Sequence, residues 1–328
     1  MDARRNPFAP GAGTRPPELA GRDALLERNA VALDRIRAGR AARPSVLYGL
    51  RGVGKPVLLT TMRDAAEGEG MAIVAIEAPE NRSLPGILVP ALRATLLRLD
   101  RMKQASDGVK RALRALAGFA KLKVKYDDLE VGLDFDVEPG LADSGDLEAD
   151  LADLLVAIGE AAREKGSAVV LVIDELQYVP EEQLAALISA LHRASQKQLP
   201  ITMIAAGLPQ LVGQMGRAKS YAERLFEFVS VGPLDDHAAR DAIRLPIERE
   251  GEAVDDAALD AICEQTQGYP YFLQEWGKHS WDAAEASPIT QDDVAAATRS
   301  ALAELDASFF RVRFDRLTPA KKRYLRAM

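Results

Sequence analysis

The feature that most constrains the fold of this 328-residue chain is a short apolar run followed by three glycines and a lysine. The run, residues 45–49, has the length and composition of a buried strand, and residues 57–67 have the apolar pattern of a helix. The residues that connect them are Gly49, Gly52, Gly54 and Lys55. Glycines let the backbone turn tightly and aim its N–H groups inward, and the following helix presents its positive end to the same place. Strand, loop and helix in this order predict a cradle for phosphate groups.

The spacing of the loop matches a nucleotide-binding pattern in every position but the last. The P-loop, or Walker A, pattern is Gly-x-x-x-x-Gly-Lys followed by Ser or Thr, and Pro56 stands where the hydroxyl residue belongs. Proline is tolerated in the first turn of a helix, but it offers neither a hydroxyl to Mg²⁺ nor an N–H to a phosphate. We therefore expect the fold to survive, nucleotide binding to weaken and hydrolysis to suffer more. The residues expected to bind the nucleotide here are Gly49, Leu50, Arg51, Gly52, Val53, Gly54, Lys55, Pro56 and Val57.

A second motif is an acidic pair after a later strand. Residues 168–173 are all apolar, which is typical of a central strand in a parallel sheet, and Asp174 and Glu175 follow directly. An Asp at the carboxyl end of such a strand can hold Mg²⁺, and an adjacent Glu can orient and polarise an attacking water. We predict Asp174 as the metal ligand (the Walker B position) and Glu175, Asp174 and Lys55 as the catalytic residues.

The remaining pattern predicts an α/β fold with a helical extension. Apolar strands near residues 71–77, 201–206 and 228–231 alternate with helices, which favours a parallel sheet flanked by helices. After Pro233 only helical patterns follow, so we place a domain boundary near Gly232. The predicted domains are an extended N-terminal arm at 1–20, an α/β nucleotide-binding domain at 21–232, a helical lid at 233–306 and a separate C-terminal segment at 307–328.

Residues 121–138 differ from their surroundings because polar and apolar side chains alternate along them. The two halves are separated by Asp127 and Asp128, and they carry basic and acidic charges respectively. This pattern predicts a β-hairpin insertion with one solvated face. The hairpin is either a decorative insertion or an edge that binds a partner.

Composition excludes several classes of protein. The apolar fraction of 48% is enough for a hydrophobic core, and the net charge of −7 argues against nucleic-acid binding by the whole surface. The single cysteine, Cys263, excludes an internal disulfide and a four-thiolate zinc site. No apolar run reaches the roughly 20 residues of a membrane helix, and the N-terminus lacks the apolar core of a signal peptide. We expect a cytoplasmic protein without a membrane partner.

Four segments together resemble the AAA+ ATPases of the origin-recognition-like (archaeal-type) and STAND groups. They are residues 17–22, 49–55, 173–175 and 268–270, and the resemblance spans about residues 16–305. It implies a P-loop NTPase fold with an all-helical lid, and ATP and Mg²⁺ as ligands. It also implies that the segment with Gly21 and Arg22 lies against the adenine ring, and that the Gly-x-Pro turn ending at Pro270 closes over the nucleotide.

Other positions of the family are less well matched. Gln210 follows the strand that presents a polar sensor to the γ-phosphate in the family, and is a weak candidate for that role. Arg224 stands where related proteins direct an arginine to a neighbouring subunit's nucleotide, which would make the protein a homo-oligomer; a surface or ion-paired arginine is the alternative. Lys278 and His279 follow the Gly-x-Pro on the same helix. They either contact a phosphate or lie on a solvated face of that helix. The spacing of His192 and His237 does not suggest a metal site.

The C-terminal segment is basic. Thr318 and Pro319 have the pattern of a helix start, as cap and first residue. In the ATPases that this chain resembles, a winged-helix DNA-binding domain begins with such a segment, so 307–328 reads as the start of a truncated domain or as a helix docked on the lid. DNA is therefore a candidate partner, and a solvated helix is the alternative. The basic residues are Arg311, Arg313, Arg316, Lys321, Lys322, Arg323 and Arg326.

These features together predict an ATP-binding AAA+/STAND-like module that acts as a nucleotide-dependent switch. ATP would bind between the α/β domain and the lid, and lid closure would change how the C-terminal segment is presented. The reaction, if the site is active, is hydrolysis of ATP to ADP and phosphate. The main alternative is a non-hydrolysing nucleotide-binding or scaffold protein, which Pro56 would suit. A small-molecule P-loop kinase is disfavoured because an Asp-Glu pair suits water as the nucleophile.

Overall fold

The computed structural model describes residues 1–11, 13–78, 80, 82–101, 107–123, 140–315 and 317–327. They form two compact units: Asp23–Val231, here called the α/β unit, and Met1–Arg22 with Gly232–Met328, here called the helical unit. Each unit has a hydrophobic core of its own. Across the described ranges we find no helix with the length and apolar character that a bilayer crossing demands.

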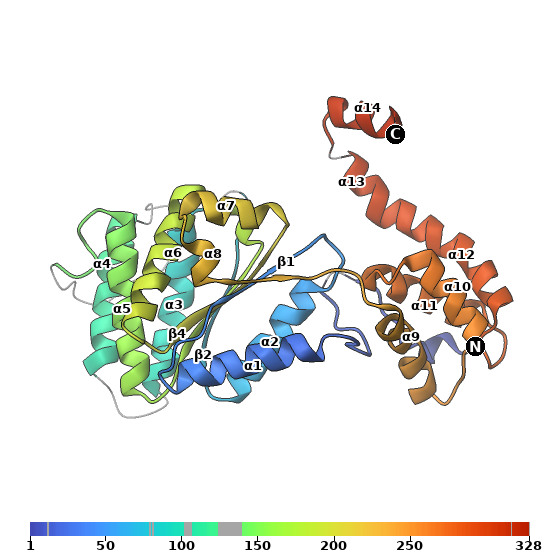
Figure 1. The fold of residues 1–328 in the computed structure, drawn as a ribbon, viewed down its shortest axis with the longest axis horizontal. Coiled ribbons are helices and arrows are strands. Elements are labelled where there is room, and N and C mark those ends of the chain that lie inside the picture. The colour runs from blue at the N-terminus through green and yellow to red at the C-terminus, as the bar shows by residue number, and fades with distance from the viewer. Residues whose placement is uncertain are drawn as a thin grey trace. The chain divides into compact units, whose positions relative to one another are not determined.

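The α/β unit is built on a five-stranded sheet in the order β2-β3-β4-β1-β5 (Figure 1). Every pair of neighbouring strands is parallel, which confirms the predicted fold class. Because the strands are parallel, the segments that follow β1, β3 and β4 emerge at the same edge of the sheet. The strands are β1 (Ser45–Tyr48), β2 (Ala72–Glu77), β3 (Val169–Asp174), β4 (Ile201–Gly207) and β5 (Glu227–Ser230).

Helices cover both faces of this sheet, as Figure 1 shows. The pair α1 and α2 packs on one face, and α3, α5 and α6 pack on the other, with α4 against α3 and α5. Strand residues therefore point alternately into two buried layers. The bounds are α1 (Asp23–Arg37), α2 (Lys55–Gly68), α3 (Leu84–Arg101), α4 (Asp107–Lys123), α5 (Leu147–Glu164), α6 (Glu181–Gln196), α7 (Gln210–Ala218) and α8 (Ala222–Leu225), with a 3-10 turn η3 (Leu176–Tyr178) after β3.

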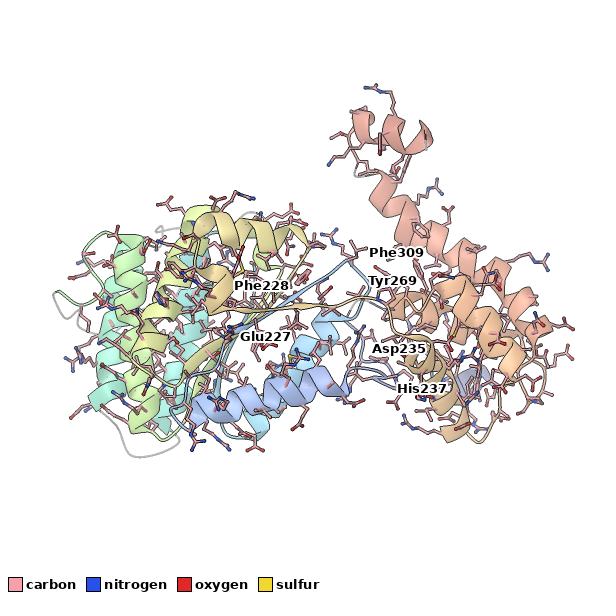
Figure 2. All side chains as sticks on the ribbon, in the orientation of Figure 1. Glu227, Phe228, Asp235, His237, Tyr269 and Phe309 are labelled. Atoms are coloured by element: carbon pink, nitrogen blue, oxygen red, sulfur yellow. The ribbon has the colours of Figure 1, made fainter. Side chains whose placement is uncertain are left out.

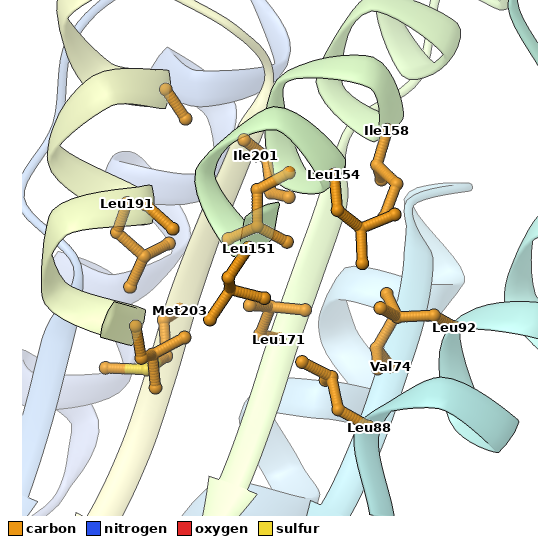
Figure 3. Close-up of a cluster of buried hydrophobic side chains, with 14 of the residues drawn as sticks. Val74, Leu88, Leu92, Leu151, Leu154, Ile158, Leu171, Leu191, Ile201 and Met203 are labelled. Carbon is orange, nitrogen blue, oxygen red and sulfur yellow. The ribbon is translucent and has the colours of Figure 1, made fainter. Parts of the chain in front are cut away.

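The layer between the sheet and α3, α5 and α6 is the larger core. Figure 3 shows Leu171 and Met203 from the strands packed against Leu151 and Leu154 of α5, and all four are almost fully buried. Their neighbours along the strands, such as Val170, are buried on the opposite face. Burial on both faces explains why the sequence of these strands is continuously apolar.

The predicted hairpin at 121–138 is wrong in its first three residues, which are the last residues of α4. Leu116, Phe119 and Ala120 are fully buried and continue the helical spacing of the apolar residues before them. At these three positions the alternating polarity belongs to the end of an amphipathic helix. Residues 124–138 of the predicted hairpin lie outside the described residues.

The helical unit contains the C-terminal helices, and caps fix several of their starts. Asp235 accepts the Ala238 N–H at 2.8 Å before α9, and Thr290 and Asp293 form a reciprocal capping box at α12. Figure 2 labels Asp235 and His237 at the start of α9. The elements are α9 (Asp236–Arg249), α10 (Asp256–Thr266), α11 (Pro270–Ala283), α12 (Gln291–Leu305), a π-helical turn η4 (Asp306–Phe310), α13 (Arg311–Asp315) and α14 (Pro319–Ala327).

The N-terminal residues also belong to the helical unit, although the sequence suggested a separate arm at 1–20. Phe8 is only 4% exposed and lies against Gly277, where an added Cβ would come within 2.8 Å of its ring. The Trp281 indole N–H donates to the carbonyl of Asp2 at 2.9 Å, and the Asn6 amide donates to the carbonyl of Lys278 at 3.0 Å. One buried aromatic ring thus anchors a segment whose Pro, Gly and Ala content suggested an extended chain.

Candidate functional site

The glycine-rich loop lies between β1 and α2 and depends on glycine at three positions. Gly52 and Gly54 have positive φ angles, 92° and 91°, in the left-handed region that L side chains rarely adopt. Gly49 is required for space, because an added Cβ would lie 2.1 Å from the carbonyl oxygen of Val231. The Gly49 N–H also donates to the carbonyl of Gly207 at 3.3 Å, which ties the start of the loop to the end of β4.

Lys55 is the first residue of α2 and lies within the loop that precedes it. Its side chain is almost buried, at 6% exposure, and its Nζ donates to the carbonyls of Gly49 and Leu50, both at 2.8 Å. Burial lowers the pKa of the Lys55 ammonium, and the negative charges of Glu175 and Asp174 act in the opposite direction. The cation and both carboxylates of the predicted site are therefore brought together in one unit.

Pro56 is the second residue of α2, so the proline lies in the first turn and the helix forms as expected. The first four N–H groups of a helix have no intrahelical partner, so they are the ones that a phosphate can use. Proline removes one of these donors. The hydroxyl of Thr61 does not replace the missing side chain, because it donates to the carbonyl of Val57 at 2.9 Å.

β3 ends at Asp174, and Glu175 follows it directly, before η3. The Glu175 N–H donates to Asp174 Oδ1 at 2.7 Å, and Glu175 itself has a positive φ of 52°. Burial raises the pKa of Asp174, with Glu175 and Glu77 adding to the shift and Lys55 opposing it. The carboxylate is half-buried among other acids, an environment that a divalent cation would relieve.

Gln177 is the residue of this site that sequence reasoning missed. It lies in η3, is 6% exposed, and donates from Nε2 to Glu175 Oε2. Its Oε1 accepts the N–H of Leu208, just after β4, at 3.0 Å. The only signal in the sequence is one amide side chain in an otherwise apolar turn after the acidic pair.

The loop and η3 are also joined by side chains. Arg51 donates from Nη2 to the Tyr178 hydroxyl at 2.8 Å. Side-chain hydrogen bonds therefore connect the glycine-rich loop, the acidic pair and η3 into one cluster at the carboxyl edge of the sheet.

Three predicted nucleotide-binding residues, Gly21, Arg22 and Pro270, belong to the helical unit. Arg22 donates from Nη2 to the carbonyl of Gly232 at 2.5 Å, and burial lowers its pKa while Asp235 acts in the opposite direction. Pro270 is the first residue of α11. Their predicted contacts with a nucleotide stay predictions.

The turn before Pro270 has close backbone packing. Gly268 accepts the Leu234 N–H at 2.8 Å, and a Cβ on Gly268 would lie 2.3 Å from the carbonyl oxygen of Leu234. The glycine of this Gly-x-Pro therefore has a packing role inside the helical unit.

The other predicted positions are distributed as follows. Gln210 begins α7 and is exposed, and Arg224 is exposed on α8. His279 does not lie on a solvated face, because its side chain is 16% exposed and its Nε2 lies 3.9 Å from Glu275 Oε2. The ring of His192 lies beside that of Tyr221, with centroids 4.7 Å apart and a tilt of 38° between the ring planes.

The donor set at the acidic pair fits Mg²⁺ better than a metal held by the protein alone. Within the described ranges, no three His, Cys, Asp or Glu side chains are grouped so as to hold a metal. Mg²⁺ in nucleotide sites is bound by one or two carboxylates together with phosphate oxygens and water. Asp174 is placed to supply the carboxylate.

A family model described as "AAA ATPase domain" matches residues 18–204, which is more than half of the chain. The chain belongs to this family. The predicted resemblance to AAA+ ATPases is thereby confirmed. The chain has no match among curated protein sequences.

Two solved structures share the fold of this AAA ATPase chain at low sequence identity. Cdc6p from Pyrobaculum aerophilum is 15% identical with a TM-score of 0.53, over 92% of this chain and 71% of that chain. The RuvB Holliday junction branch migration motor of Thermotoga maritima is 15% identical with a TM-score of 0.51, over 88% of this chain and 73% of that chain. Identities this low show a common fold alone.

Proposed function

We propose that this AAA ATPase domain binds ATP together with Mg²⁺ and acts as a nucleotide-dependent switch. The observation that supports this most is Lys55, a buried ammonium in a glycine loop, under the electrostatic influence of Asp174 and Glu175. The position of a buried cation at a helix N-terminus suits a polyanionic ligand, because the phosphates would supply the countercharge. In the nucleotide complex, phosphate oxygens would replace the two loop carbonyls as the acceptors of hydrogen bonds from the Lys55 ammonium.

The roles of the residues follow from their positions. The glycine loop and Lys55 would hold the phosphates, and Asp174 would hold Mg²⁺, which supplies charge neutralisation on the phosphate oxygens. Glu175 would orient water for attack. Because Pro56 removes one N–H donor and one hydroxyl, we propose that binding persists at reduced affinity and that hydrolysis is slow.

The finer features of the switch are also proposals. Lys321 and Arg323 are exposed on α14, which supports DNA as a partner of the basic segment. Exposure of Arg224 is compatible with a role at a subunit boundary. Cytoplasmic localisation agrees with the absence of membrane-type segments in the sequence.

Titration with a fluorescent ATP analogue, with and without Mg²⁺, tests the proposal. We expect saturable binding by the wild-type protein and at least a tenfold weaker affinity for Lys55→Ala. Titration with an analogue labelled on its adenine ring and competition with unlabelled ATP should both rank the affinities of the wild type and Lys55→Ala in the same order. The proposal is wrong if neither the wild type nor Pro56→Thr binds.

Turnover then separates the switch from the non-hydrolysing alternative. Phosphate release by Pro56→Thr but not by the wild type would support the alternative, in which the wild-type protein binds ATP without hydrolysing it. Phosphate release by both would show an active ATPase.

A further inference from the structure

Gln177 connects two parts of the site that are distant in sequence. One end of its amide donates to the carboxylate of Glu175, and the other end accepts the backbone N–H of Leu208 at 3.0 Å. Leu208 and Pro209 form the loop between β4 and α7, here called the β4–α7 loop. A single buried side chain thus makes hydrogen bonds to the predicted base and to the neighbouring strand end.

The surroundings of Gln177 hold this amide in one orientation. Gly207 leaves the space that the amide occupies, because a Cβ there would lie 2.7 Å from Gln177 Oε1. The side chain of Gln214 on α7 donates to the main-chain carbonyl of Gln177 at 3.4 Å. Since an amide has a donor end and an acceptor end, only a glutamine in this rotamer satisfies both partners.

We propose that Gln177 is a positioning residue that couples the carboxylate of Glu175 to the β4–α7 loop. The inference rests on the proposed function, in which Glu175 orients water. The amide fixes Oε2 of Glu175 and thereby the direction in which Oε1 points. A displacement of Leu208 moves the acceptor end of the same amide, so the loop sets the position of the base.

The coupling can be measured without nucleotide, by amide hydrogen exchange at Leu208. Gln177→Leu removes the acceptor and should raise the exchange rate of Leu208 about tenfold, which corresponds to the loss of one hydrogen bond. Glu175→Ala removes only the partner of Nε2, and should also raise the rate at Leu208 several-fold. In the Gln177→Leu background, Glu175→Ala should have no further effect. A Leu208 rate that Glu175→Ala leaves at the wild-type value would overturn the proposal.

Gln183 on α6 provides a matched control. Its Oε1 accepts the N–H of Leu84 at 2.7 Å, so it makes the same kind of contact elsewhere in the α/β unit. Gln183→Leu should raise exchange at Leu84 and leave Leu208 unchanged. A change at Leu208 in this variant would indicate a general loosening of the unit and would count against a specific link.

A turnover arm tests the consequence for chemistry in the Pro56→Thr background, where we expect faster hydrolysis. Gln177→Met keeps the length of the side chain and adds no charge, but it removes both the donor to Glu175 and the acceptor for Leu208. We expect kcat to fall tenfold or more, with KM for ATP and the affinity for the analogue unchanged. Equal losses in kcat and in affinity would indicate structural damage and overturn the positioning role.

The two arms also separate this inference from the proposed function. Loss of analogue binding in every form of the protein would refute the nucleotide site, while coupled exchange at Leu208 would still support the Gln177 link. Normal binding with uncoupled exchange would refute the link alone.

Discussion

At the scale of single residues, Pro56 changes what α2 offers to an anion without preventing the helix. Pro56→Ala restores the missing N–H, and Pro56→Thr restores the N–H and adds a hydroxyl. A hydrogen bond to a charged group contributes about 1.5–3 kcal/mol, or roughly ten- to hundredfold in affinity. We expect Pro56→Ala to tighten ATP-analogue binding by about tenfold in the absence of Mg²⁺, measured by fluorescence titration.

Comparison of the two Pro56 variants isolates the hydroxyl. The further gain of Pro56→Thr over Pro56→Ala should appear only with Mg²⁺, because the hydroxyl is expected to act on the metal. Equal affinities for the two variants in Mg²⁺ would show that the metal does not reach this position.

Gly49 is the loop position with the tightest packing. Gly49→Ala would place a Cβ against the carbonyl oxygen of Val231, a backbone atom that cannot rotate away. We expect the free energy of unfolding of the α/β unit to fall by about 2 kcal/mol in chemical denaturation, as in other cases of overpacking. Gly68→Ala is the matched control, because it meets no atom within 4 Å at the end of α2 and should be neutral or stabilising.

The sequence predicted those site residues whose role depends on local spacing. Lys55 and Asp174 were predicted because a glycine loop and an acid after an apolar strand are signatures within one short segment. Gln177 was missed because its role depends on β4 lying next to β3, and the chain between these strands includes all of α6. A contact of that kind is fixed by strand order, which no local pattern specifies.

At the scale of elements, a salt bridge joins α5 to the segment that follows α7. Lys219 Nζ lies 2.8 and 2.9 Å from the two carboxylate oxygens of Glu148, and Ser189 of α6 donates to Oε1 at 2.7 Å. The hydrogen bonds from Lys219 and then Ser189 lower the pKa of Glu148. The same segment continues through Tyr221, whose hydroxyl lies 3.1 Å from the Ser189 hydroxyl. This network holds in place the turn that carries α8.

The lowered pKa of Glu148 predicts a pH-dependent stabilisation. A depressed folded-state pKa stabilises the fold above the unfolded-state pKa, and this contribution is lost as pH falls through the folded value. Because Glu148 is 46% exposed, we expect Lys219→Met to lower the free energy of unfolding by less than about 1 kcal/mol near pH 7. The difference from wild type should shrink as denaturation is repeated at pH 5, 4 and 3.

Lys197→Met provides the control for this series, because Lys197 is an exposed lysine at the end of α6. It should change stability little at any of these pH values. A Lys219→Met difference that stays constant down to pH 3 would mean that the ion pair is not its origin.

Element boundaries were predictable where amphipathic pattern and caps coincide. Asp146 caps α5 by accepting the Ala149 N–H, and Asp235 caps α9 by accepting the Ala238 N–H, each just before an apolar pattern of helical period. The helical end of α4 was misread because its last residues alternate in polarity, and a three-residue alternation fits either period. Burial of the preceding apolar residues decides between them, and that burial is a tertiary property.

At the scale of the whole molecule, the helical unit is built from both ends of the chain, and the N-terminal residues complete its core. Phe8 is part of that core, together with Trp276 and Trp281 of α11. The aromatic residues Tyr271, Phe272 and Phe309 pack against the same core, and Figure 2 labels Phe309 among them. A sequence reading that assigns domains as consecutive segments cannot anticipate a unit made from two ends of the chain.

This arrangement predicts that a change at residue 8 destabilises the helical unit selectively. Both tryptophans of the chain lie on α11, so tryptophan fluorescence reports on the helical unit alone. Truncation of a buried phenylalanine costs about 3 kcal/mol or more. We expect Phe8→Ala to shift the fluorescence-monitored unfolding transition to lower denaturant, while hydrogen exchange in β3 and β4 stays close to wild type. Phe310→Ala, at a ring that is 47% exposed in the same unit, should shift the transition much less. If Phe8→Ala lowered the stability reported by hydrogen exchange in β3 and β4 as much as that reported by tryptophan fluorescence, the two cores would unfold as one. Only when the cores unfold separately can the loss of a single ring weaken one unit and leave the other unchanged.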